Sequence, residues 1–120
     1  FAAEAVLERG VNLCLGTDSL ATVHDSGAEL DLFEEMRLFI QNHPRITAEA
    51  CVNMVTQNAA LALGLQRQVG SLEPGKSADL IILPHSKVGG DLAEQIVAHQ
   101  GEVDAVMING EWVAGTRKAA

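Results

Sequence analysis

The spacing of apolar residues predicts helices over the first half of the chain. Residues 1–9 have an apolar edge and stop before Gly10, which suits the left-handed end of a helix. A second helix is expected to end near residue 41, and either Ser26 or Asp31 has the spacing of its N-cap. Its apolar stripe lies at helical intervals and comprises Leu32, Phe33, Met36, Phe39 and Ile40.

The pair His43-Pro44 ends that helix, because a proline disfavours helical geometry in the residue before it. Thr47 can then cap a third helix, which carries apolar residues to position 55. A bend near Asn58 is expected before a last helical turn over 59–63. Gly64 followed by an apolar residue is typical of a helix that ends in a Schellman motif.

The second half of the chain reads mainly as strands. The stretch GSLEPGKSADLIILP, residues 70–84, predicts a strand, a type II turn at Pro74-Gly75 and a second strand. Residues 91–99 suggest a short helix. The stretch DAVMINGEWV, residues 104–113, predicts a hairpin, since Asn109-Gly110 tolerates the positive φ angles of a type I′ turn.

Residues 11–16 predict a short strand that ends close to a carboxylate. Val11, Leu13 and Leu15 fall on one face of this strand. Asp18 would share the opposite face with Asn12 and Cys14 if the strand geometry continues to residue 18. A lone strand followed by helices cannot cover its own faces, so we expect parallel neighbours that these 120 residues do not contain.

Composition narrows the class of protein. The chain has 120 residues, is 48% hydrophobic and has a formal net charge of −8, as for one soluble domain. Its scattered Lys and Arg residues argue against a nucleic-acid partner, and no apolar run is long enough to span a membrane. Cys14 and Cys51 lie in apolar contexts, which favours two reduced, buried thiols and a cytoplasmic protein. The chain begins with Phe1 rather than Met, as expected of a piece of a longer protein or of a processed one.

Most of the familiar catalytic patterns are missing from the sequence. It contains no glycine-rich phosphate loop and no Gly-x-Ser-x-Gly elbow. The histidines are far apart in sequence and are expected to be solvated, with more weight given to the one that follows Asp18: His24, His43, His85 and His99. Glu34 and Glu35 point about 100° apart on a helix, which favours a solvated face over a shared site.

Asp18 is therefore the main candidate, and it has two interpretations. Aspartate is common in turns, so the residue can simply cap the turn after the strand. Alternatively, it can face a metal ion or a substrate. Spacing alone leaves both interpretations open.

Five segments in the same order resemble the C-terminal part of the amidohydrolase superfamily, in the branch of chlorohydrolases and aminohydrolases. The segments are GVNLCLGTDSLAT, LDLFEEMRLF, ITAEACVNMVTQNAALALGL, GSLEPGKSADLIIL and VDAVMINGEWV. The resemblance implies an α/β fold: the end of a metal-dependent-hydrolase TIM (β/α)8 barrel over residues 1–66, with the last strand at 11–16. Residues 67–120 would supply the C-terminal strands of a composite β-sandwich.

The resemblance also implies a chemistry. Asp18 would be a ligand of one divalent metal, zinc or iron, and would move the proton of the attacking water. Ser19 and His24 would lie at the substrate, although Ser19 fits a turn cap equally well. The implied reaction is deamination of a purine- or pyrimidine-like small molecule, with dechlorination or cyclic-amide hydrolysis as alternatives.

The histidine ligands of the family lie on strands outside these residues. One carboxylate cannot hold zinc, so we expect the 120 residues alone to bind no catalytic metal and to be inactive. A parent enzyme could be a homo-oligomer. A non-catalytic relative, in which Asp18 only caps a turn, remains the rival interpretation.

Overall fold

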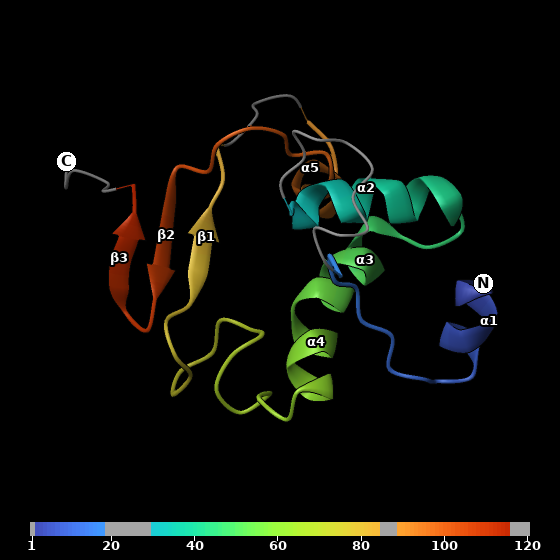
Figure 1. The fold of residues 1–120 in the computed structure, drawn as a ribbon, viewed down its shortest axis with the longest axis horizontal. Helices are drawn as coiled ribbons and strands as arrows, with labels where there is room; N and C mark the ends of the chain where they lie inside the picture. Colours follow the sequence, from blue (N-terminus) through green and yellow to red (C-terminus); the bar gives the residue numbers. More distant parts are fainter. Residues whose placement is uncertain (1, 19–29, 85–88, 116–120) are drawn as a thin grey trace.

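The chain folds into a group of helices beside a small antiparallel sheet (Figure 1). The computed structural model describes residues 2–18, 30–84 and 89–115. The helices in this part of the chain are α1 (Ala3–Glu8), α2 (Leu32–Asn42), α3 (Ala48–Val55), α4 (Gln57–Ala62) and α5 (Leu92–Val97). The strands are β1 (Leu80–Ile82), β2 (Ala105–Ile108) and β3 (Glu111–Ala114). Within the described residues, none of the helices is long and apolar enough to cross a membrane.

The ends of the helices follow from local sequence, largely as predicted. Asp31, not Ser26, is the N-cap of α2, and its carboxylate accepts a hydrogen bond from the Phe33 amide at 2.9 Å. Ser26 lies outside the described residues. Thr47 caps α3 by accepting a hydrogen bond from the Ala50 amide at 3.2 Å. Both caps satisfy amides that have no partner inside the helix.

The expected bend in the third helical stretch occurs two residues earlier than predicted. Thr56 has φ −121° and ψ −90°, so α3 ends before it and α4 begins after it. At the far end of α4, the Leu65 amide donates to the Ala60 carbonyl at 2.8 Å, and Gly64 has φ +73°. These features confirm the predicted Schellman motif.

The sheet has the order β1-β2-β3, with antiparallel pairing throughout. The β2–β3 hairpin turns at Asn109 and Gly110, whose φ angles are +50° and +82°, as the predicted type I′ turn requires. Pro74-Gly75 forms the predicted turn, with Gly75 at φ +90° and a Lys76-to-Glu73 backbone hydrogen bond of 3.2 Å.

Two predicted strands are not strands in the structure. Residues 70–73 are bent or irregular instead of forming a strand. Gly70 has φ +96° and lies so close to α4 that a Cβ on it would be 2.7 Å from the Cβ of Ala60. Residues 11–16 pair with no strand in the described part of the chain. The described residues contain no sheet neighbours for such a strand, and the segment is held by helices instead.

Two groups of buried side chains hold the helices together. Ala3, Ile46 and Met54 join α1 to α3, with Leu13 and Leu15 packed against them. Met36, Cys51 and Val97 join α2, α3 and α5. Burial of these side chains is the main stabilising term for the helical layer.

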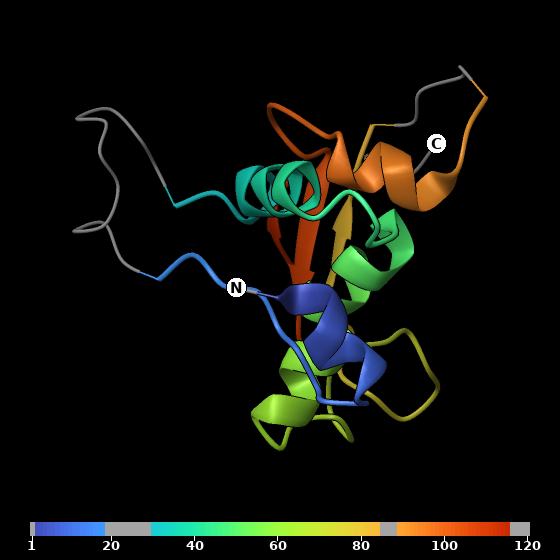
Figure 2. The same cartoon turned by 90° about the vertical axis from the view of Figure 1, so that its right-hand side faces the viewer.

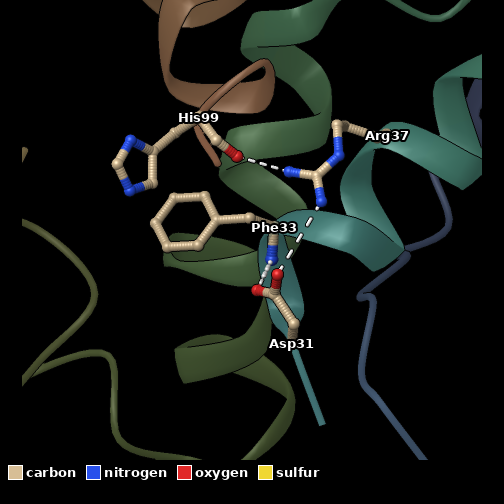
Figure 3. Close-up of polar contacts among 4 residues, drawn as sticks. All are labelled: Asp31, Phe33, Arg37 and His99. Carbon is tan, nitrogen blue, oxygen red and sulfur yellow. Dashed lines mark hydrogen bonds and ion pairs between the residues drawn. The ribbon is translucent and has the colours of Figure 1, made fainter. Parts of the chain in front are cut away.

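The helices lie on one side of the sheet, and α1 lies on the side of α3 and α4 that faces away from it (Figures 1 and 2). Between α3, α4 and the sheet there is an open apolar groove of about 740 Å³, whose lining includes Val52, Val55, Leu80 and Val106. The groove does not reach the segment that carries Asp18. α5 is tied to α2 by Arg37, which donates a hydrogen bond to the His99 carbonyl (Figure 3).

Candidate functional site

Asp18 is exposed, and it ends the described segment 11–18, which follows α1 and packs against α3 and α4. The segment alternates in burial: Leu13 and Leu15 are half-buried under the helices, whereas Asn12 and Cys14 are exposed with Asp18. This is the alternation that the sequence predicted, although no sheet partner is present in the described residues. Asp18 is exposed at the end of this alternating segment. Val11, expected to pack with the leucines, is 52% exposed instead, since it lies at the turn out of α1.

The backbone at Asp18 is in the left-handed region, with φ +57°. A residue with a Cβ pays a steric penalty in this region, on the order of 1 kcal/mol, although Asp is among the residues that tolerate it best. Such outliers persist where the surrounding structure dictates them, and they occur often at functional sites.

Three contacts from helices hold the segment in place. The Leu15 amide donates to the Met54 carbonyl at 3.2 Å. The side-chain amide of Asn58 donates to the Leu13 carbonyl, and that of Asn12 donates to the Asn58 carbonyl, each at 2.9 Å. From the sequence, Asn58 was expected only near a helix bend, and Asn12 had no expected role. The two residues lie 46 positions apart and carry no local signal that joins them.

The described residues do not by themselves fit a catalytic metal. Within residues 2–18, 30–84 and 89–115, no three His, Cys, Asp or Glu side chains come together as a group able to bind one. Zinc takes three or four protein ligands, whereas Asp18 offers a single carboxylate. Further ligands would have to come from outside this part of the chain.

Ser19 and His24, the predicted substrate contacts, lie outside the described residues, as does His85. Two other histidines correct the expectation that they are solvated. The Nδ1 atom of His43 lies 3.3 Å from Glu4 Oε2, with both side chains mostly buried. The Nε2 atom of His99 is buried with no hydrogen-bond partner among the described residues, because the ring packs edge-on against Phe33, with 4.9 Å between ring centroids.

The two thiols differ, which corrects the prediction that both are buried. Cys51 has no exposed surface, and burial raises the pKa of its thiol. Cys14 is exposed because it lies on the face of the segment that looks away from the helices. Glu34 is exposed, as expected for a solvated helix face, and Glu35 is half-buried.

The similarity to known proteins extends over nearly the whole chain. The sequence pattern of the amidohydrolase family matches residues 1–113. The chain belongs to the amidohydrolase family. A 5-methylthioadenosine/S-adenosylhomocysteine deaminase from Halalkalibacterium halodurans is 40% identical to this amidohydrolase chain over 103 residues, which are 80% of the chain and 22% of that protein. A protein of the same name from Thermotoga maritima is 34% identical over 120 residues, which are 92% of the chain and 28% of that protein.

Solved structures show the same relationship. An adenosine deaminase from Xanthomonas campestris with bound zinc superposes with a TM-score of 0.80 and 28% identity, over 98% of the amidohydrolase chain and 29% of that protein. Guanine deaminase from E. coli superposes with a TM-score of 0.73 over 96% of the chain and 30% of that protein; at 17% identity the likeness is one of fold. The chain thus has the mixed helix and strand fold of one part of these proteins, and spans about a quarter of the length of the curated relatives.

Proposed function

We propose that residues 1–120 are the C-terminal portion of a longer, metal-dependent amidohydrolase that deaminates a purine-like small molecule. The observation that carries the proposal is the exposure of Asp18 at the end of a segment that is hydrogen-bonded to the helices, with its backbone in the left-handed region. The deaminase names of the relatives support the choice of reaction. A 6-aminopurine nucleoside such as 5-methylthioadenosine is the first substrate to test.

In this proposal residues 11–16 are the last strand of a (β/α)8 barrel, and Asp18 lies at its C-terminal end, where barrel enzymes place their active sites. Residues 1–66 belong to the barrel, and residues 67–120 belong to a small β-sandwich. The alternation of Leu13 and Leu15 with Cys14 and Asp18 supports this assignment, because barrel strands direct alternate residues inward and outward.

The reaction adds water to the ring carbon that carries the amino group and then releases ammonia, which leaves a carbonyl at that carbon. In this proposal Asp18 accepts a proton from the attacking water and returns it to the departing amino group. A divalent metal, zinc or iron, acts in such sites as a Lewis acid that makes water nucleophilic near neutral pH. Asp18 would contribute one ligand to it, and the remaining ligands would come from outside these residues. Ser19 and His24 are the proposed substrate contacts.

The test is ammonia release from 5-methylthioadenosine by the full-length protein and by its Asp18→Asn variant. We expect the variant to lose on the order of 10²- to 10⁴-fold in kcat, as is typical when a general acid–base group is removed. Asp104→Asn is the matched control, since it removes another exposed carboxylate, on the sheet side of the chain. Unchanged turnover in Asp18→Asn would leave Asp18 as a turn residue. Chloride release from a chlorinated ring without ammonia release would favour dechlorination.

The same proposal has consequences for the whole protein. Residues 1–120 alone are expected to release no ammonia and to retain no zinc, because they supply one ligand of the set. Elemental analysis and the same ammonia assay check this, and turnover by the 120 residues alone would overturn it. The full-length protein is proposed to be a cytoplasmic homo-oligomer that acts on a small molecule and has no nucleic-acid or membrane partner.

A further inference from the structure

The break between α3 and α4 gives backbone groups to the segment that carries Asp18. The Thr56 hydroxyl donates to the Val52 carbonyl at 2.8 Å, a side-chain bond of a kind that bends helices. The Thr56 amide bonds to the Asn53 carbonyl at 3.2 Å, and the regular helical geometry is lost at this residue. The Met54 carbonyl, just before the break, accepts the Leu15 amide instead.

Asn58, in the first turn of α4, contacts the same segment twice. Its side-chain amide donates to the Leu13 carbonyl, and its own carbonyl accepts from the Asn12 side chain, both at 2.9 Å. With the Leu15 amide on Met54, these bonds fix three positions within four consecutive residues. Each bond is made at one particular position of the segment, so together the three bonds define its register against the helices.

Register decides where the carboxylate of Asp18 lies. In an extended segment, a slip of one residue moves every side chain by about 3.3 Å and to the opposite face. Asp18 is only three residues beyond Leu15, so little chain separates it from the last of these hydrogen bonds. A slip would bring Asp18 toward the helices and turn Leu13 and Leu15 outward.

We propose that Asn58 is a positioning residue for Asp18: it sets the register of residues 12–15 on the α3–α4 break and thereby fixes the place of the carboxylate. This inference rests on the proposed function, because it concerns the same site. Asn58 does not touch the substrate. It acts through the backbone of Leu13 and through the side chain of Asn12.

Asn58→Asp in the full-length protein tests the proposal, because it preserves size while replacing the amide donor with an acceptor. We expect kcat for 5-methylthioadenosine to fall by about 10- to 100-fold, since a small misplacement of a reacting group costs that much. The KM is expected to stay within about twofold, as for an interaction needed mainly in the transition state. Asn42→Ala is the matched control: its side-chain amide donates to the Leu38 carbonyl at 2.8 Å inside α2, and its loss should leave kcat unchanged.

A double-mutant cycle separates positioning from a general structural role. If Asn58 acts through Asp18, then adding Asn58→Asp to Asp18→Asn lowers kcat no further than Asp18→Asn alone. If the two losses multiply, or if Asn58→Asp folds normally and keeps full kcat, the proposal is wrong. Should Asn58→Asp fail to fold, Asn12→Asp takes its place. It removes only the exposed donor to the Asn58 carbonyl, and its kcat is measured with and without Asp18→Asn.

Hydrogen exchange of the Leu15 amide gives a readout that does not depend on catalysis. We expect faster exchange in Asn58→Asp than in Asn42→Ala, because the bond from the Asn58 side chain to the Leu13 carbonyl, two residues from the Leu15 amide, is lost. Faster exchange in Asn58→Asp, together with an unchanged kcat in Asp18→Asn, would refute the proposed function but not the role of Asn58 in fixing the segment. Unchanged exchange would refute that role even if Asp18 proves catalytic.

Discussion

The Arg37 guanidinium donates a hydrogen bond to the backbone carbonyl of His99, just after the end of α5 (Figure 3). The same guanidinium lies 3.7 Å from the Asp31 carboxylate, measured from Nη2 to Oδ2. The other carboxylate oxygen of Asp31 accepts the Phe33 amide and so caps α2. One arginine thus joins the start of α2 to the end of α5, two elements that lie far apart in the sequence.

Arg37→Lys is expected to lower the free energy of unfolding by about 1–2 kcal/mol. Lysine keeps the charge but lacks the planar fork that serves two acceptors, and hydrogen bonds to charged groups contribute about 1.5–3 kcal/mol each. The urea midpoint of the full-length protein measures the effect. Arg45→Lys is the control, because Arg45 is exposed, and its effect should be within about 0.5 kcal/mol. Equal effects of the two substitutions would contradict the structural role of Arg37.

Glu4 and His43 predict a pH dependence of stability. The pKa of Glu4 is held below its ordinary value of 4.5, first by a hydrogen bond from its own backbone and then by His43 and Arg45, with desolvation opposing. Because the pKa is lower in the folded state, this stabilisation is fully present above pH 4.5 and is lost as the pH falls through the folded value.

Glu4→Gln should therefore lose less stability than the wild type when the pH is lowered from about 5 to 3. Thermal midpoints of the full-length protein at several pH values check this. Glu8→Gln, an exposed change in the same helix, should follow the wild-type curve. Parallel curves for the wild type and Glu4→Gln would show that the contact carries no linked proton.

The thiols predict a selective modification. In the 120-residue chain, Cys14 should react with a thiol reagent at least about tenfold faster than Cys51, because exposure favours reaction and a raised pKa leaves little thiolate. Peptide mapping after brief labelling identifies the site, and both thiols should react in denaturant. Preferential labelling of Cys51 would contradict the packing of α3 against α2.

Substitutions at Gly70 and Gly75 distinguish two costs to stability, the crowding of an added Cβ and the strain of a left-handed backbone. Their φ angles are nearly equal, at +96° and +90°, but a Cβ at Gly70 would lie 2.7 Å from the Cβ of Ala60, whereas one at Gly75 would meet nothing within 4 Å. Gly75→Ala should cost about 1–2 kcal/mol of stability for the left-handed backbone alone. Gly70→Ala should cost a further 1–3 kcal/mol or so from overpacking. Thermal unfolding of the two variants gives the difference, and equal midpoints would show that the 70–73 bend can move off α4.

Local chemistry made much of the fold predictable from the sequence. The Asp31 and Thr47 caps, the Gly64 helix end and the Asn109-Gly110 hairpin each depend on a few adjacent residues. The prediction failed where distant residues decide the outcome. The stretch 70–73 has a strand-like sequence, but it forms no strand, and Gly70 packs closely against Ala60 of α4.

The candidate site likewise combines features set by local sequence with features set by distant residues. The alternation of exposure over residues 12–15 was predictable because it is a property of the segment itself, whereas the Asn12–Asn58 contact joins residues with no shared local pattern. The exposure of Cys14 was missed because an apolar sequence context was interpreted as burial. Which face of the segment is covered depends on the rest of the fold. The role of Asp18, the contacts of Ser19 and His24 and the domain boundary at residue 66 stay predictions.

The segment before Asp18 is held on the helices partly through its own peptide groups, the Leu13 carbonyl and the Leu15 amide. Peptide groups are the same for every residue type other than proline, so these two attachments place no demand on the exposed side chain of Cys14. Mutation can therefore alter the lining beside the carboxylate while the backbone stays in place. This separation offers a route by which one scaffold could acquire new substrate preferences without refolding.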